Sequence, residues 1–415
     1  MHVLVLAQYF PPDMGGGATR AYNVVKGLML NGCKVTVVAA FPHYPKGDIP
    51  KQYRWKLLKV EFFENIKVVR TFVPPLASKG LIRRIILFIS FMLSSLFALP
   101  LVGKIDIIWA ANPNILSIVP AIVFGFVKHC PVTLNVDDPW PEDLYSFGLL
   151  EEGSIASKIA EFLARLAYHK AELITPISPG YIKIISGKYG VGANKIYVVR
   201  AGVDLKKFKP RDSKPVNSRF LVLYSGAFSV AYDFNQVIKA AKLLENYGDI
   251  EIVLQGGGEL SKSIRESIGK MNVKNVKLID KILSREEVAK LLNQADALLL
   301  PLKDFGTPYL GISSKLYEYQ AAGKPIICCA DGQPAEYVKK TNSGIVVRPR
   351  DYKALAEAIL YLRENRDIAE ELGASGRRYV EDNLSVEKIG LRMVRIFQQV
   401  IANRCPCKEE HDENA

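Results

Sequence analysis

One short segment combines a cation with a hydroxyl acceptor on a single helical turn. Ser313, Ser314, Lys315 and Glu318 stand where a small polar stretch is predicted to open a helix. The free N–H groups of such a helix start, together with the Lys315 ammonium, favour a diphosphate. Glu318, about one turn further on, can accept hydrogen bonds from ribose hydroxyls. The alternative interpretation is an ordinary solvated helix face.

Three glycine-containing turns add possible phosphate contacts. Residues 11–18, called the glycine loop below, follow an apolar run and include Gly16 and Gly17. The turns at 226–229 and 256–258 follow apolar runs in the second half of the chain. Glycines let the backbone approach a ligand closely, although a tight turn is the simpler interpretation of each. None of them forms the GxGxxG pattern, which disfavours a nicotinamide cofactor.

Alternating apolar runs and helical patterns must position these residues. Strands are predicted at 3–7, 34–40, 105–110, 132–136, 173–176, 196–199, 220–225, 250–255, 276–279, 297–301 and 325–329, with helical patterns between most of them. Such alternation predicts an α/β fold in which parallel sheets carry helices on both faces. Two Rossmann-like domains are expected, with ligand sites at the carboxyl ends of both sets of strands, facing each other across a cleft.

A polar stretch without apolar periodicity marks the predicted domain boundary. The expected divisions are a first domain at 1–204, a linker at 205–218, a second domain at 219–384, a helix at 385–403 that packs back on the first domain, and a polar tail at 404–415.

Composition narrows the functional class. The 415 residues and 49% apolar content suffice for two hydrophobic cores. Lys and Arg outnumber Asp and Glu by 55 to 42, which suits a negatively charged partner, but the basic residues are dispersed, which disfavours nucleic acid. Six scattered cysteines show no disulfide framework, and the first residues lack the features of a signal peptide. A cytoplasmic location is expected.

The stretch 85–103 carries no formal charge and approaches the length of a membrane span. A buried helix and a helix lying in a membrane surface are both open, the second with Lys79, Arg83 and Arg84 near anionic headgroups. A true span would sever one sheet and is the least favoured alternative.

Five motifs together resemble glycosyltransferase family 4, whose members are retaining enzymes of the GT-B fold. They are S-S-K-L-Y-E-Y-Q-A-A-G-K-P-I-I at 313–327 with A-D-A-L-L-L-P-L at 295–302, P-P-D-M-G-G-G-A-T-R at 11–20, D-D-P-W-P-E-D at 137–143, R-A-G-V-D-L-K-K-F-K-P at 200–210, and G-G-G-E-L at 256–260. Together the motifs span nearly the whole chain. The W-P-E and S-K-x-x-E pieces are similar to amino-sugar transferases of cell-surface polysaccharide synthesis.

The resemblance implies an acceptor-side first domain and a nucleotide-sugar-binding second domain. The implied donor-binding residues are Gly16, Gly17, Gly226, Ser229, Gly257, Ser313, Ser314, Lys315 and Glu318. Asp138 and Lys315 are the expected catalytic residues, and Arg83, Arg84, Trp140 and Glu142 are expected on the acceptor or membrane side. The family often has a second glutamate eight positions before Glu318, but this chain has Leu310 there.

The implied activity is transfer of a hexose or N-acetylamino sugar from a nucleotide diphosphate sugar, with a UDP-sugar favoured, to a saccharide or lipid-linked saccharide. No cofactor and no metal are expected, because Lys315 and the backbone amides can stabilise the leaving phosphate. A polyprenyl-linked acceptor and peripheral contact with the inner face of the cell membrane are the expected partners. Two alternatives stay open: a nucleotide-sugar epimerase and an inactive, membrane-associated assembly protein.

Overall fold

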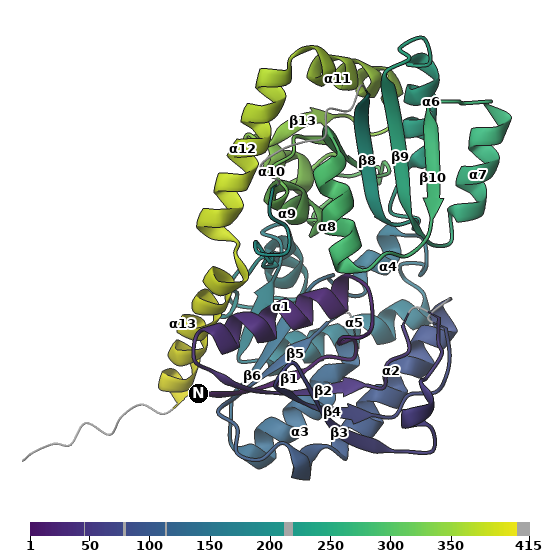
Figure 1. The fold of residues 1–415 in the computed structure, drawn as a ribbon. Helices are drawn as coiled ribbons and strands as arrows, with labels where there is room; N and C mark the ends of the chain where they lie inside the picture. The colour runs from purple at the N-terminus through teal and green to yellow at the C-terminus, as the bar shows by residue number, and fades with distance from the viewer. Residues whose placement is uncertain (45, 78–79, 113, 211–218, 405–415) are drawn as a thin grey trace, which may run out of the picture. The chain divides into compact units, whose positions relative to one another are not determined.

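The computed structural model describes residues 1–44, 46–77, 80–112, 114–210 and 219–404 (Figure 1). The chain divides into two compact units. Unit 1 contains Met1–Gly202 and the chain from Val386 onward, and unit 2 is Val203–Ser385. Each unit is an α/β layer structure around a largely parallel sheet, so the predicted fold class of two Rossmann-like domains is confirmed. Lys79, residues 211–218 of the predicted linker and 405–415 of the predicted tail lie outside the described residues.

Unit 1 is built on a seven-stranded sheet in the order β3-β4-β2-β1-β5-β6-β7. The strands are β1 His2–Leu6, β2 Lys34–Ala40, β3 Leu58–Phe63, β4 Ile66–Thr71, β5 Ile107–Ala111, β6 Val132–Val136 and β7 Leu173–Pro176. Only β3 and β4 pair antiparallel, as a hairpin at the sheet edge. The helices of unit 1 are α1 Gly16–Leu30, α2 Leu81–Leu96, α3 Ile118–Lys128, α4 Glu142–Ser146, α5 Ile155–Lys170 and α13 Val386–Arg404.

The predicted strand at 196–199 is wrong. Ile196 makes an isolated parallel bridge to Ile174 of β7, and the Tyr197 and Val199 amides donate to carbonyls of β7 at 2.9 Å each. The segment thus follows the edge strand without becoming a regular strand. Helix α1 begins at Gly16, directly after Gly15 with φ +130°, so the last three residues of the glycine loop belong to the helix.

Helices α1 and α13 pack closely within unit 1, although they come from opposite ends of the sequence (Figure 1). Gly27 of α1 and Gly390 of α13 form the contact: a Cβ atom on Gly390 would collide with the Gly27 carbonyl, and one on Gly27 with the Val386 carbonyl. Two glycines facing each other allow the helix backbones to touch.

Unit 2 is built on a six-stranded, fully parallel sheet in the order β10-β9-β8-β11-β12-β13. The strands are β8 Phe220–Ala227, β9 Ile250–Gly257, β10 Val276–Asp280, β11 Ala297–Pro301, β12 Ile326–Cys329 and β13 Gly344–Val347. The helices are α6 Phe234–Leu243, α7 Ser261–Lys270, α8 Arg285–Gln294, α9 Lys315–Ala321, α10 Gln333–Lys340, α11 Tyr352–Glu364 and α12 Arg366–Asn383. A core of aliphatic and aromatic side chains, including Val222, Leu254 and Ile359, is fully buried between sheet and helices.

Each sheet has a point where the strand order reverses direction. In unit 1, β1 pairs with β2 on one side and β5 on the other; in unit 2, β8 pairs with β9 and β11 in the same way. Crossovers leave such a strand pair toward opposite faces, so a crevice opens at its carboxyl end. These two crevices are the places where ligand-binding residues are expected.

Candidate functional site

Lys315 lies at the crevice of unit 2. It is the first residue of α9, and its Nζ donates to the Tyr232 hydroxyl at 3.1 Å. The ammonium also lies 5.1 Å from the centroid of the Tyr232 ring and 5.9 Å from that of Tyr224. A Cβ atom on Gly226, at the end of β8, would collide with the Lys315 side chain. The structure therefore brings Gly226 and Lys315 together, with the cation half-exposed.

Glu318 lies on the same face of α9, three residues further along. Its carboxylate forms a two-point ion pair with Arg285 of α8, with N–O distances of 2.5 and 3.3 Å. Burial alone would lower the pKa of Arg285, but the Glu318 carboxylate outweighs burial and raises it. The Glu318 side chain is 13% exposed. Its carboxylate therefore keeps an open side on which a hydroxyl group can donate.

The β8 and β9 ends show which glycines are structurally required. A Cβ atom on Gly256 would collide with the Gly226 carbonyl, and one on Gly258 with the Phe228 carbonyl. Gly257 has room for a Cβ atom, whose nearest neighbour would be Ile282 at 3.4 Å. Gly256 and Gly258 thus allow the two strand ends to approach each other. At position 257, by contrast, no close contact requires a glycine.

Ser229, Ser313 and Ser314 frame this crevice through their backbones. The Ser229 carbonyl accepts from the Tyr232 amide at 3.1 Å, and that turn brings Tyr232 to Lys315. The Ser313 and Ser314 carbonyls accept from amides in the first turn of α9. The Ser314 side chain makes no capping hydrogen bond and is exposed, so its hydroxyl is accessible to a ligand.

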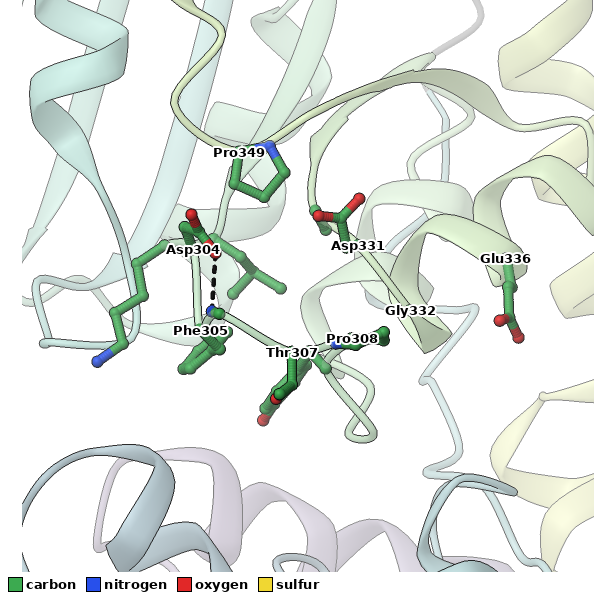
Figure 2. A pocket seen from close by; sticks show the side chains of 13 residues that line it. Asp304, Phe305, Thr307, Pro308, Asp331, Gly332, Glu336 and Pro349 are labelled. Atoms are coloured by element: carbon green, nitrogen blue, oxygen red, sulfur yellow. Dashed lines mark hydrogen bonds between the residues drawn. The ribbon is translucent and has the colours of Figure 1, made fainter.

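A pocket of about 320 Å³ opens beside the carboxyl ends of β11 and β12 (Figure 2). Residues 302–309 form one wall, where Phe305 and Tyr309 stack with ring centroids 4.8 Å apart. Asp304, Asp331 and Glu336 line it with carboxylates, and Asp304 accepts from the Gly306 amide at 2.8 Å. Across the described residues, no group of three or more His, Cys, Asp and Glu side chains could hold a metal ion. Metal independence stays a prediction.

In unit 1, Arg20 of α1 joins three of the motifs. It lies 3.5 Å from the Asp137 carboxylate and donates to the carbonyls of Val199 and Arg200 at 2.8 and 2.7 Å. Its side chain is 5% exposed. The Asp137 carboxylate also accepts from Asn135 at 2.8 Å. A buried cation thus fixes the helix after the glycine loop to the ends of β6 and the 199–200 segment.

A small hollow lies at the crevice between β1 and β5. Gln8, Gly17 and Asn112 are among its lining residues. The Gln8 Nε2 and Asn112 Oδ1 atoms are buried and have no hydrogen-bond partner within the described part of the chain. The Asn112 amide donates to the Asp138 carbonyl at 2.8 Å, which brings Asp138 to this crevice. Gly16 is more open, since a Cβ atom there would meet nothing within 4 Å.

Carboxyl groups cluster where the D-D-P-W-P-E-D motif follows β6. Burial raises the pKa of Asp137 to about 6, although the Arg20 charge lowers it. Burial and the neighbouring Asp138 carboxylate raise the pKa of Asp143 well above its ordinary value. Asp138 is exposed and Asp143 is half-buried. The raised pKa makes Asp143 a stronger base than an ordinary carboxylate, a property that the sequence interpretation did not attribute to it.

The other predicted first-domain residues are dispersed. Arg83 and Arg84 are exposed in the first turn of α2, and Trp140 is half-buried before α4. Glu142 accepts from the Tyr189 hydroxyl at 2.7 Å and lies 3.0 Å from Lys188, so its Oε1 atom is engaged within unit 1.

Two family models together match most of the chain. Residues 14–207 match Glycosyltransferase Family 4, and residues 206–379 match Glycosyl transferases group 1. The chain belongs to glycosyltransferase family 4. The predicted family and the predicted enzyme class, a glycosyltransferase, are thereby confirmed.

This family 4 chain is 25% identical over 248 residues to the MMP alpha-(1->4)-mannosyltransferase of Mycolicibacterium hassiacum. That match covers 60% of this chain and only 58% of the relative. The putative colanic acid biosynthesis glycosyl transferase WcaI of Escherichia coli is 24% identical over 420 residues, covering 94% of this chain and 98% of the relative. The structure of Anabaena HepE in complex with UDP aligns with a TM-score of 0.68 at 15% identity, over 96% of this chain and 100% of HepE. This likeness shows that the family 4 chain shares its fold.

Proposed function

We propose that this protein transfers a sugar from a nucleotide diphosphate sugar to a saccharide or lipid-linked saccharide during polysaccharide synthesis. A UDP-sugar is the favoured donor. The observation that carries the proposal is the Lys315 ammonium held beside Gly226, with Glu318 on the same helix face. The UDP bound to the structural relative HepE and the activities named for the two sequence relatives support the same substrate class.

Lys315 would bind the diphosphate. Cleaving the bond between sugar and phosphate builds negative charge on the leaving oxygen, and a fixed cation stabilises this charge. Tyr232 holds the Lys315 Nζ atom in position, and the faces of the Tyr224 and Tyr232 rings attract the ammonium. We propose that no metal ion is needed for this step.

Glu318 would bind the ribose. Arg285 occupies part of its carboxylate, and the remaining lone pairs can accept from two hydroxyl groups on adjacent carbons. Leu310 leaves the position of the family's other glutamate without a carboxylate. The pocket in Figure 2 offers the carboxylates of Asp304 and Asp331 in its place, and we propose that hydroxyls of the transferred sugar face this pocket.

The acceptor hydroxyl must lose a proton as it attacks. Asp143, next to Asp138, can take it, because burial and the Asp138 carboxylate raise the pKa of Asp143 and so make its carboxylate a stronger base. The reaction forms the new bond between the sugar's anomeric carbon and the acceptor oxygen, breaks the bond to phosphate, and releases the nucleoside diphosphate. The proposed retention of configuration corresponds to attack from the same face that the phosphate leaves.

Thermal unfolding with UDP, GDP and ADP tests the donor site before any acceptor is known. We expect UDP to raise the melting temperature, because a ligand at 100 times its Kd adds about 2.7 kcal/mol to the free energy of unfolding. Incubation with UDP-sugars, followed by detection of released UDP, then tests catalysis. If GDP stabilises in place of UDP, the donor base is corrected; if no nucleotide stabilises the folded protein, the proposed function is wrong.

Replacing Glu318 by glutamine is expected to weaken UDP binding about 10- to 100-fold, equivalent to the about 1.5–3 kcal/mol of hydrogen bonds to a charged group. Isothermal titration measures the change. Glu371→Gln, an exposed residue of α12, is the matched control and should bind as the wild type does. Equal affinities of the Glu318→Gln variant and the wild type would remove Glu318 from the site.

Replacing Gly226 by alanine is expected to lower the rate of sugar transfer strongly and the free energy of unfolding only modestly. The new Cβ atom would displace the flexible end of the Lys315 side chain, and φ at this position is +152°. Backbone strain of this kind costs about 1–3 kcal/mol, a loss that urea unfolding measures. The Gly248→Ala variant, where an added Cβ atom would meet nothing within 4 Å, is the matched control for space. A fully active Gly226→Ala variant would show that the position of Lys315 does not matter.

A further inference from the structure

Unit 1 exposes large apolar side chains on three neighbouring helices. Right-handed crossovers place α2, α3 and α5 on one face of the sheet and α1 on the other, because the chain moves from β1 to β2 in one direction and from β5 to β7 in the opposite direction. On that face α2 packs against α3, and α3 against α5. Ile82 is 75% exposed, Phe126 is 79% exposed and Ile155 is 80% exposed.

Helix α5 carries large apolar side chains on its outer side. Its core side carries mainly small side chains, since Ala160, Ala164 and Ala167 are buried there together with the larger Tyr168. Ile159 and Phe162, on the opposite side of the same helix, are 57% and 65% exposed. A helix of a water-soluble protein usually places its large apolar residues inward. Here the arrangement is reversed, which indicates that something other than water covers the outer side.

The apolar area continues beyond the helices onto the edge strand β3. Phe63 contacts Tyr22 of α1, with ring centroids 6.2 Å apart, so Phe63 faces the α1 side of the sheet. Side chains alternate along a strand, and Phe62 therefore faces the side on which α2 packs. Phe62 is 74% exposed. We call the outer sides of α2, α3 and α5, together with Phe62, the three-helix surface.

The charges on this surface are almost all positive. Helices α2, α3 and α5 contain six basic residues and one acidic residue, Glu161, which is paired with Lys188 at 2.8 Å. The basic residues are Arg83, Arg84, Lys128, Lys158, Arg165 and Lys170. Two copies of the chain that met through this surface would bring these positive charges together, which is unfavourable. A flat partner that is apolar beneath a negatively charged layer matches both features.

We propose that the three-helix surface binds an anionic lipid bilayer, with its apolar side chains in the interface and its basic residues on the headgroups. No helix within the described residues is long and apolar enough to cross a membrane. Binding would therefore be peripheral, with the three helices lying along the bilayer. This proposal goes beyond the proposed transfer reaction and does not require it.

Flotation of the full-length protein with vesicles tests the proposal. We expect binding to vesicles that contain phosphatidylglycerol, and much weaker binding to vesicles of phosphatidylcholine alone. The triple variant Phe126→Ser, Ile159→Ser, Phe162→Ser is expected to bind at least about 10-fold more weakly, because exposed apolar side chains supply the insertion energy. Arg83→Gln, Arg84→Gln is expected to lose about 5-fold for each arginine, and salt should have the same effect on the wild type.

The matched control variant carries Leu243→Ser, Tyr361→Ser and Leu391→Ser, three exposed apolar positions outside this surface. It should bind as the wild type does. Because all substituted side chains are exposed, melting temperatures should stay close to that of the wild type. Three results would overturn the proposal: equal binding by the triple variant and the wild type, equal binding to both kinds of vesicle, or a dimer in gel filtration that the triple variant loses.

Discussion

Replacing Lys315 by methionine is expected to lower the rate of sugar transfer about 10²- to 10³-fold, the usual effect of removing one group that stabilises an oxyanion. Methionine keeps a flexible apolar stem beside Gly226 and removes the charge. Because the leaving diphosphate gains negative charge in the transition state, the loss should appear in kcat more than in the affinity for the donor. Steady-state kinetics with a UDP-sugar, with or without an acceptor, measures both quantities.

The matched control is Lys270→Met at the end of α7, an exposed lysine of the same unit. It removes the same charge from the same sheet-and-helix layer and should leave kcat unchanged. Unchanged kcat for the Lys315 variant as well would contradict the proposed role and turn attention to the Ser313 and Ser314 amides. A loss confined to the affinity for the donor would make Lys315 a binding group only.

Replacing Arg70 by methionine is expected to lower the free energy of unfolding of unit 1 by about 3–5 kcal/mol, the usual cost of breaking a buried ion pair from one side. Arg70 has no exposed surface and donates to the Glu61 carboxylate at 2.8 Å. It also donates to the carbonyls of Phe10, Pro11 and Ala40, which lie just beyond β1 and at the end of β2. Its loss removes one donor from each of three carbonyls and the buried cation from the Glu61 carboxylate, which keeps its contacts with Tyr53 and Lys59. Urea unfolding measures the change.

A double-mutant cycle with Glu61→Gln separates the ion pair from the carbonyl contacts. If the pair dominates, the double variant should recover part of the lost stability. Burial alone would raise the pKa of Glu61, but its bonds to Arg70 lower it below 4.5 overall. The pair should therefore stabilise the fold fully above pH 4.5 and progressively less as the pH falls through the lowered pKa. A loss below about 1 kcal/mol for Arg70→Met, measured at neutral pH, would contradict the prediction.

The sequence was sufficient for the regular parts of both sheets. Short apolar runs bounded by turn residues located β6, β7 and β11 at their observed bounds. The β3–β4 hairpin was not predicted, because an edge strand mixes charged and apolar residues and gives no continuous apolar run. The 196–199 segment gave the opposite error, since its apolar residues pack beside β7 without regular pairing.

The types of the site residues could be predicted, but their partners could not. Lys315 and Glu318 lie in one helical turn that the sequence pattern predicted. Arg285, which holds Glu318, is 33 positions away and gave no local signal. Arg20 likewise belongs to a recognised motif, yet its contact with Asp137 depends on the strand order of unit 1. The outward face of α5 was missed because periodicity locates an apolar stripe without saying whether the alanine side or the isoleucine side faces the core.

The contact of α1 with α13 at Gly27 and Gly390 also determines the order in which the two units can complete their folding during synthesis. Most of unit 1 precedes unit 2 in the chain, but the helix that covers α1 follows unit 2. Unit 2, in contrast, is one uninterrupted piece of chain and is completely synthesised before α13 emerges. Domains generally fold as units once their sequence is available. Unit 1 is therefore the unit whose synthesis starts first and whose folding is completed last. Until α13 has been synthesised, the outer side of α1 stays uncovered.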